Sequence, residues 1–206
     1  QPELTITQGH QSVLDDVKDA VQDYMVGAGV SEMMTYSFIK ANAYDKMLLA
    51  ADDARRSCIE LLNPITDAFS VMRTTMIPSA LQTASFNLRN HNSSVALFEV
   101  GRVFLPQSLP LTADPVERQL LTAVLSGSRQ ELNWCTEKGA VDFYDMKGIV
   151  EGLLEALQVS DYTMIRSGQP YLHPGKSCDI VVEGKVIGSF GEVHPVVQEN
   201  FDLDQV

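Results

Sequence analysis

Two strings of residues decide the fold of this chain: Met72-Arg73-Thr74-Thr75-Met76-Ile77-Pro78 and Phe98-Glu99-Val100-Gly101-Arg102-Val103-Phe104. The proline that closes the first string suits the first turn of a helix, which predicts a helix over residues 79–88. The second string lies in the most strand-like segment of the chain, residues 95–104, which is rich in Val, Leu and Phe. Its alternation is imperfect, as expected of a strand that is covered on both faces. We therefore predict a strand over residues 95–104 that is buried on both faces.

The segment before these strings begins with a predicted amphipathic helix over residues 12–26. Ser12 can cap this helix, and Asp15 and Asp16 suit the positive end of the helix dipole. Apolar residues recur at three- and four-residue spacing and form one stripe: Val13, Leu14, Val17, Val21, Tyr24 and Met25. Three further elements are predicted here: a strand over 33–39, a short helix over 43–50 and a strand over 58–62.

The segment after the two strings contains more strands and one long helix. That helix, over residues 143–158, can be capped by Asp142 with Asp145 in its first turn. Strands are predicted over residues 118–125, 162–167, 177–183 and 185–193, and a short helix from Pro195. Gly184 supplies a positive φ for the tight turn between the last two strands. The strands cluster without regular helix alternation, so we predict an α+β fold over residues 1–206, one domain whose mostly antiparallel sheet is flanked by helices.

The composition is that of an ordinary globular protein, with 45% apolar and 20% charged residues in a chain of 206. No apolar run approaches the ~20 residues that cross a bilayer. The N-terminus has neither an initiator Met nor a signal sequence, so we expect an excised piece of a longer, cytoplasmic protein without a membrane partner. Three widely spaced cysteines, Cys58, Cys135 and Cys178, predict free thiols in a reducing compartment.

The net charge of −12 bears on the choice of partners. Nucleic-acid binders usually carry a basic patch, because phosphate contacts supply most of their non-specific affinity. The fifteen Lys and Arg residues of this chain are scattered, and only Arg55 and Arg56 are adjacent. We therefore expect the chain alone to bind RNA weakly or not at all.

Six strings, taken in order, resemble the β subunit of bacterial phenylalanyl-tRNA synthetase in its catalytic-like core. They are Asn63-Pro64, Met72-Arg73-Thr74, Leu97-Phe98-Glu99-Val100-Gly101-Arg102-Val103-Phe104, Asp142-Phe143-Tyr144-Asp145-Met146-Lys147-Gly148, Tyr171-Leu172-His173-Pro174-Gly175 and Gly188-Ser189-Phe190-Gly191-Glu192-Val193-His194-Pro195. Each string alone is a weak signal, but six in one order are specific. The resemblance covers nearly the whole chain.

The resemblance implies a class II aminoacyl-tRNA synthetase fold and a part in attaching L-phenylalanine to its tRNA. In that family the α subunit carries the active site, and the β subunit carries a degenerate copy of the same fold. The implied partners are the α subunit, in a heterotetramer of two α and two β chains, and tRNA through the holoenzyme. ATP and Mg²⁺ serve the holoenzyme, and no cofactor is expected in this fragment.

Arg73 and Arg102 are the residues most easily taken for catalytic arginines, because an arginine fork clamps a carboxylate or phosphate. The class II pattern, however, places its arginine and glutamate just after the strand, where this chain has Leu105-Pro106-Gln107. The closing string likewise lacks the arginine of the third class II motif. We therefore assign no catalytic and no cofactor-binding residue. Arg73 and Arg102 are predicted to form structural ion pairs, with Glu99 or with an acid of the α subunit.

Two other groups of residues are interpreted as structural. His173, His194 and Cys178 match no zinc-ligand spacing, so no metal site is assigned, and the two histidines are predicted to bond nearby backbone in turns. Among the acids, Asp142 and Asp145 suit a helix start, where each stabilises the dipole by ~0.3–1 kcal/mol. Glu151 and Glu155 lie one turn apart on the exposed face of the same helix.

Two features point to close packing or to an interface. Gly148 and Gly152 lie one turn apart on the second long helix, where glycine costs roughly 1 kcal/mol relative to alanine. A closely packed neighbour would compensate, and an internal neighbour is favoured over one from another subunit. The helix over residues 12–26, with the strand after it, resembles the first class II motif, which builds dimer interfaces. We expect part of that helix to face the α subunit, and complete burial of its stripe would contradict this.

We thus predict a noncatalytic scaffold that holds the α subunit and links the neighbouring domains of the β chain. The holoenzyme is a phenylalanine-tRNA ligase, and the fragment alone is expected to be inactive. The alternative is a free-standing regulatory or ligand-binding module on a degenerate class II fold. Its mark would be a preformed pocket with convergent polar groups near Arg73, Glu99 and Arg102.

Overall fold

The structure is a computed structural model that describes residues 9, 12–64, 66, 69–129 and 139–203. Its helices are α1 (Val13–Gly27), α2 (Ala43–Lys46), the 3-10 helix η1 (Ala54–Arg56), α3 (Ile77–Arg89), α4 (Phe143–Ala156) and α5 (Pro195–Asn200). Its strands are β1 (Ser31–Glu32), β2 (Phe38–Ile39), β3 (Val71–Met72), β4 (Ser94–Leu105), β5 (Val116–Gly127), β6 (Thr163–Arg166), β7 (Leu172–Val182) and β8 (Lys185–Val193).

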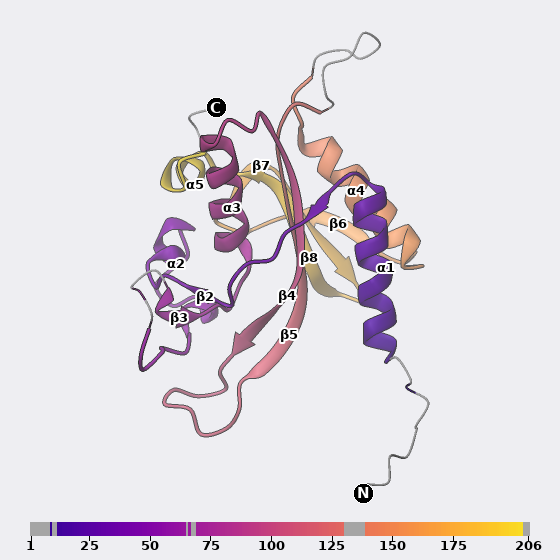
Figure 1. The fold of residues 1–206 in the computed structure, drawn as a ribbon. Coiled ribbons are helices and arrows are strands. Elements are labelled where there is room, and N and C mark those ends of the chain that lie inside the picture. The colour runs from indigo at the N-terminus through magenta and orange to yellow at the C-terminus, as the bar shows by residue number, and fades with distance from the viewer. Residues whose placement is uncertain (1–8, 10–11, 65, 67–68, 130–138, 204–206) are drawn as a thin grey trace, which may run out of the picture.

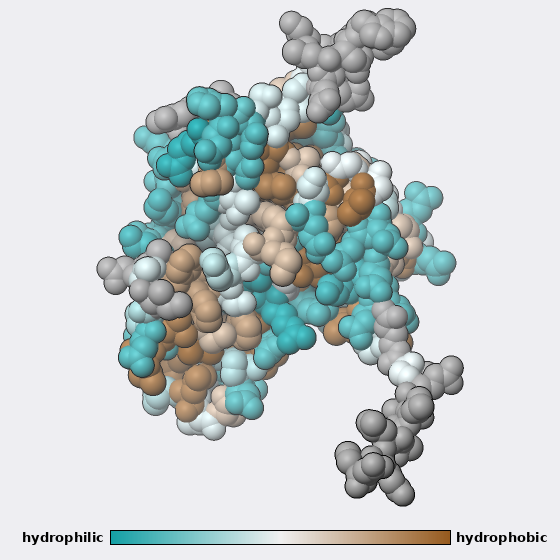
Figure 2. Space-filling model, in the orientation of Figure 1, coloured by the Kyte–Doolittle hydropathy of each residue, from teal (hydrophilic) through white to brown (hydrophobic). Residues whose placement is uncertain are grey.

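The strands form two three-stranded sheets and one small pair. The first sheet has the order β1-β4-β5, the second β6-β7-β8, and β2 pairs with β3. The only parallel pairing among the described strands joins β1 to β4, and every other pair is antiparallel. The long hairpin of β4 and β5 extends beyond the helices (Figure 1). Apolar side chains gather over its end in Figure 2, where Leu109 and Leu111 are exposed.

Helices cover both faces of the two sheets. In Figure 1, α1 and α4 lie on one side of them, and α2, α3 and α5 lie on the other. The helix α4 joins the sheets, because Ile149 and Leu153 pack with β4 and β5, whereas Leu154 packs with β7 and β8. Phe143 at the start of α4 stacks on Phe190 of β8 with ring centroids 5.4 Å apart. Within the described residues, no helix is long and apolar enough to span a bilayer.

The long elements confirm the predictions from the sequence. Ser12 caps α1 in a capping box with Asp15, and Asp142 and Asp145 form the same box at α4. Both boxes satisfy backbone N–H groups that have no partner within the helix. At the turn between β7 and β8, Gly184 has a φ of +75°. The mostly antiparallel α+β architecture with flanking helices is also confirmed.

Three short elements were predicted wrongly. Of the strand over residues 33–39 only β2 remains, and β1 lies before that range. The segment between β1 and β2 leaves the sheet to meet Arg73, whose backbone N–H donates to Ser37 O. The strand over 58–62 is reduced to one isolated bridge between Glu60 and Val71. The helix over 43–50 ends at Lys46, since Leu48 has a φ of +59°, which no helix continues through.

Candidate functional site

Arg73 is the centre of a buried polar cluster beneath the hairpin. Its Nη2 donates to Glu99 Oε1 at 3.0 Å, and its Nη1 donates to Thr35 Oγ1 at 2.8 Å. The second carboxylate oxygen of Glu99 accepts a bond of 2.6 Å from the Thr35 hydroxyl. Arg73 is 2% exposed and Glu99 5% exposed. A buried charge pair is tolerated when further hydrogen bonds satisfy both partners, and this pair meets that condition.

The local backbone holds this cluster in place. Arg73 Nε donates to the carbonyl of Arg102 at 2.8 Å, and Phe104 N donates to the carbonyl of Arg73 at 2.9 Å. Gly101 leaves room for the guanidinium, because a Cβ there would collide with Nη2 of Arg73. The cluster therefore ties the segment between β1 and β2 to β3 and β4. The predicted ion pair between Arg73 and Glu99 is confirmed.

Arg102 does not join this cluster through its side chain. Its guanidinium pairs across the hairpin with Glu117 at 2.9 Å, and both side chains are about half exposed. The two arginines of the decisive strings therefore point to different environments. One is buried in internal contacts, and the other forms a surface pair between β4 and β5.

The predicted bonds between the two histidines and nearby backbone are confirmed, although His173 lies within β7 and not in a turn. His173 Nδ1 accepts a bond from Gly175 N at 3.0 Å, and His194 Nδ1 accepts one from Val196 N at 3.2 Å, which caps α5. Cys178 lies on β7 opposite Phe190. In the described part of the chain, no three His, Cys, Asp or Glu side chains gather in a group suited to a metal ion. Cys135 lies outside the described residues.

The acidic residues of α4 form its capping box and ion pairs on its surface. Arg129 pairs with Asp145 at 2.7 Å and with Asp142 at 3.3 Å, so one guanidinium joins both residues of the capping box. Slight burial raises the pKa of Asp145, but the hydrogen bonds from Arg129 and the Asp142 backbone outweigh it and lower that pKa. Glu151 pairs with Lys147 one turn earlier at 3.3 Å, and Glu155 is exposed.

The glycine prediction holds for one of the two positions. A Cβ at Gly152 would collide with the hydroxyl of Tyr24, so α1 and α4 pack closely there. This is the internal neighbour that the sequence favoured. Around Gly148, in contrast, the described residues leave space for a Cβ.

The apolar stripe of α1 divides into a buried and an exposed half. Val21 and Met25 are buried against Phe98 of β4, together with side chains of α4. Val13 is 80% exposed and Leu14 59% exposed. Monomeric proteins rarely leave adjoining large apolar side chains uncovered on a helix without a binding role. The exposed half of α1, defined by Val13, Leu14 and Val17, is therefore a candidate contact surface.

A polar cluster that the sequence analysis missed lies between η1 and β7. Arg55 forms a bidentate pair with Asp53, donates to Gln169 Oε1 at 2.9 Å, and stacks over the ring of Tyr171 at 5.6 Å. The hydrogen bond from the Arg55 side chain lowers the pKa of Asp53 to about 2. An acid that can cap a short helix, followed two residues later by an arginine, was the available signal.

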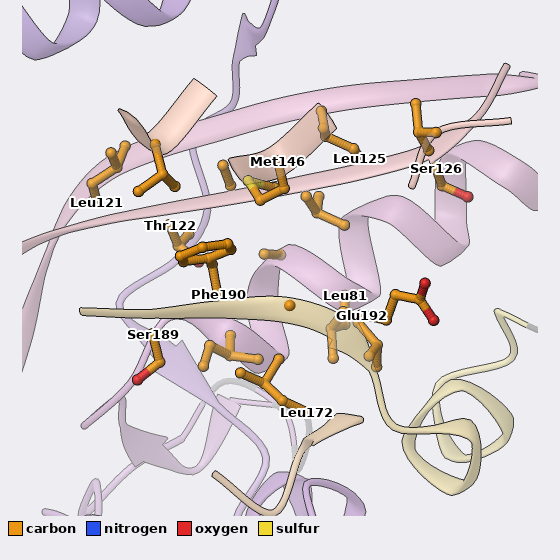
Figure 3. A pocket seen from close by; sticks show the side chains of 18 of the residues that line it. Leu81, Leu121, Thr122, Leu125, Ser126, Met146, Leu172, Ser189, Phe190 and Glu192 are labelled. Atoms are coloured by element: carbon orange, nitrogen blue, oxygen red, sulfur yellow. The ribbon is translucent and has the colours of Figure 1, made fainter. Parts of the chain in front are cut away.

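A cleft of about 1840 Å³ lies between the two three-stranded sheets. Long runs of β5 and β8 line it, with α4 on one side and α3 on the other. Figure 3 shows Thr122 and Phe190 entering it from these strands. Arg73, Glu99 and Arg102 are absent from its lining. Thr74, the neighbour of Arg73, does line it, and the alternative function as a ligand-binding module stays a prediction.

Comparisons with known proteins agree with this architecture. The crystal structure of pyrrolysyl-tRNA synthetase from Desulfitobacterium hafniense superimposes with a TM-score of 0.69 over 94% of this chain and 63% of that chain. The sequence identity is 15%, so the likeness concerns the fold alone. The chain thus has the fold of a class II aminoacyl-tRNA synthetase.

The sequence comparisons are more specific. The family model described as the phenylalanyl tRNA synthetase beta chain CLM domain matches residues 1–206, and the chain belongs to this family. The phenylalanine–tRNA ligase beta subunit of Geobacter metallireducens is 40% identical over 90% of this chain. That of Clostridium acetobutylicum is 34% identical over 95% of it. The chain spans 23% of the length of each of these relatives.

Proposed function

We propose that this domain is a noncatalytic scaffold that holds the α subunit in a phenylalanine–tRNA ligase. Exposure of the N-terminal half of α1 is the observation that carries the proposal. The C-terminal half of the stripe already fixes the helix to β4 and α4, so the exposed half is presented on a rigid support. A rigid apolar surface binds a partner at a lower entropic cost than a mobile one.

The remainder of the assembly follows from the family. Relatives are named beta subunits, so a partner α subunit is expected, with two copies of each chain in the holoenzyme. In this proposal the holoenzyme uses ATP and Mg²⁺ to attach L-phenylalanine to its tRNA in the cytoplasm. The domain reaches tRNA only through that assembly.

The proposal that the domain is inactive rests on Arg73. Its guanidinium is occupied by Glu99, Thr35 and the Arg102 carbonyl, so it has no free fork for a substrate carboxylate or phosphate. ATP–pyrophosphate exchange driven by phenylalanine measures adenylation directly. We expect no exchange above the level without enzyme, and phenylalanine-dependent exchange by this chain would overturn the proposal.

The scaffold role is tested by light scattering after size exclusion, with the α subunit from the same source. We expect a complex heavier than either component. Leu14→Ser together with Val17→Ser should weaken that complex at least about tenfold, since each removes apolar area from a contact. Leu62→Ser is the matched control, because Leu62 is 98% exposed and lies outside α1. Equal binding by both variants would remove α1 from the interface.

A further inference from the structure

The end of the β4–β5 hairpin, defined as residues 105–116, carries almost no charge. Asp114 is the only charged residue in this range, in a chain of which 20% is charged. Leu109 is 50% exposed, Leu111 44% and Val116 39%. Figure 2 shows apolar side chains gathered over this end. Exposed loop tips are usually small and polar, so an apolar tip indicates a contact surface.

The hairpin end is braced from within. Ser108 Oγ donates to the carbonyl of Pro110 at 3.3 Å and lies 2.8 Å from Thr112 Oγ1. Pro110 and the two other prolines of the loop, Pro106 and Pro115, have their φ angles fixed by their rings. A loop that is already held in one shape loses little conformational entropy when it binds.

The hairpin end lies just beyond the start of α1. Met25, near the end of α1, packs with Phe98 of β4. Near the start of α1, hydrogen bonds from Ser12 lower the pKa of Asp15, and the charge of Arg102 adds a smaller effect of the same sign. Between these two contacts, helix and strand advance together by ~13–15 Å. Because β4 continues past Arg102, the hairpin extends further than the helix.

The polypeptide enters the described fold at this same end. α1 begins at Val13, and Figure 1 shows the start of α1 and the hairpin end at the lower end of the view. Leu203, which follows α5, lies at the opposite end. The relatives are about four times longer than this chain, since it spans 23% of them. Any polypeptide of the longer protein that leads into α1 therefore passes close to the hairpin end.

The size of the surface favours a partner within the same chain. Leu109, Leu111 and Val116 together offer far less than the ~800 Å² that each partner buries in a stable complex of separate proteins. A partner that is already tethered nearby needs less, because a short linker gives it a high effective concentration.

We propose that the hairpin end docks on the part of the β chain that leads into α1 and fixes the orientation of that part relative to this domain. The receiving surface should be apolar and uncharged, because aliphatic side chains cannot replace the hydrogen bonds of a polar group that they bury. The part of the chain before α1 would then be held at two points, through the backbone at α1 and through the hairpin end.

Photo-cross-linking in the full-length β chain, co-produced with the α subunit, identifies the neighbour of the hairpin end. Leu109→p-benzoylphenylalanine should cross-link to peptides of the β chain that precede α1. Ile165→p-benzoylphenylalanine is the matched control, because Ile165 is also 50% exposed but lies in β6, and it should not reach these peptides. Cross-links from position 109 to the α subunit, to the β chain after residue 206, or only within this domain would overturn the proposal.

Isotope labelling distinguishes the same chain from a second copy of it. The assembly is prepared from a mixture of isotope-labelled and unlabelled β chains, all with the reactive group at position 109. A contact within one chain joins peptides that carry the same label. Pairs of labelled with unlabelled peptides would place the hairpin end on the second copy and refute the proposed contact.

Hydrogen exchange on the full-length chain tests whether the contact holds the neighbouring part in place. Leu109→Ser together with Leu111→Ser should make the cross-linked peptides before α1 exchange at least about tenfold faster. Ile165→Ser should leave their exchange unchanged. Unchanged exchange in the double variant would show that the hairpin end does not hold this part of the chain, contrary to the proposal.

The proposal does not rest on the scaffold role. Contact with the α subunit is tested by the substitutions of Leu14 and Val17, whereas the hairpin contact is tested at Leu109 and Leu111. If the α subunit binds equally well to the α1 variant while the cross-links form within the β chain, the interface at α1 fails and the hairpin contact stands.

Discussion

At the scale of single residues, the structure uses its charged side chains to hold segments together. Arg73 contacts two segments that are far from it in the sequence: residues 35–36, through Thr35 and Tyr36, and β4, through Glu99 and the carbonyl of Arg102. Such a cluster is favourable only while it is complete, because each member is buried and satisfied by the others. Loss of one member therefore matters more than the strength of any single bond.

This reasoning predicts the effect of Glu99→Gln on stability. The substitution leaves the guanidinium of Arg73 buried without a countercharge, which should lower the free energy of unfolding by ~3–5 kcal/mol. Glu117→Gln breaks the exposed pair with Arg102 and should cost at most ~1 kcal/mol. Chemical denaturation of both variants beside the unmodified chain measures the difference. Equal losses of stability would mean that the buried pair of Arg73 and Glu99 stabilises the fold no more than the exposed pair of Arg102 and Glu117.

The pair of Asp53 and Arg55 predicts a dependence on pH. The folded pKa of Asp53, about 2, lies below the ordinary value of 3.8. Its contribution to stability is therefore fully present above about pH 4 and is lost as the pH falls towards 2. Asp53→Asn should be less stable than the unmodified chain at pH 6, and the gap should close on acidification to pH 2. Thermal melts at both pH values test this, with Asp52→Asn as the exposed control.

At the scale of elements, the helices are defined by local signals. The capping box of α4 satisfies the N–H groups of Tyr144 and Asp145 through Asp142. Asp142→Ala should lower the free energy of unfolding by about 1 kcal/mol, the usual cost of losing an N-terminal cap. Asp161→Ala, an exposed acid beyond the end of the helix, should have no measurable effect. Urea denaturation compares the two variants, provided that their free energies of unfolding fall with urea concentration at the same slope. An unchanged midpoint for Asp142→Ala would contradict the prediction.

The elements that were predictable from sequence are those with local determinants. The helices α1, α3 and α4 follow from caps, proline position and apolar periodicity, and the long strands follow from their composition. The failures lie where distant contacts decide the structure. Residues 33–37 have a strand-like sequence, but they leave the sheet because the side chain of Arg73 donates hydrogen bonds to Thr35 and Tyr36. No local sequence pattern predicts these bonds.

The same distinction applies to the candidate sites. The pairing of Arg73 with Glu99 was one of two alternatives that the sequence offered, the other being an acid of the α subunit, and the structure decides for Glu99. The cleft between β5 and β8 was not predictable, because the sequence does not show how two separate sheets are placed relative to each other. Likewise the contact of Gly152 with Tyr24 was predicted only as close packing, and its partner had to come from the arrangement of α1 and α4.

At the scale of the whole molecule, charge determines which partners the domain meets directly. The net charge of −12 opposes a polyanion, and several arginines are already paired with acids, including Arg55, Arg73, Arg102 and Arg129. Non-specific nucleic-acid binding draws on free cationic groups that release counterions, with a typical Kd of ~10⁻⁴–10⁻⁶ M. This surface supplies few such groups, so its contacts with tRNA should pass through other parts of the assembly.

The resulting prediction is that this domain alone does not retain tRNA in a filter-binding assay at ~0.15 M salt, even at a protein concentration of about 100 μM. Lowering the salt to ~0.05 M should leave the result unchanged, because longer-range repulsion from the acidic surface grows as screening weakens. A basic protein of similar size provides the positive control. Micromolar binding that weakens steeply with added salt would reveal a cationic surface, and the role of this domain would then extend from holding a subunit to holding the nucleic acid itself.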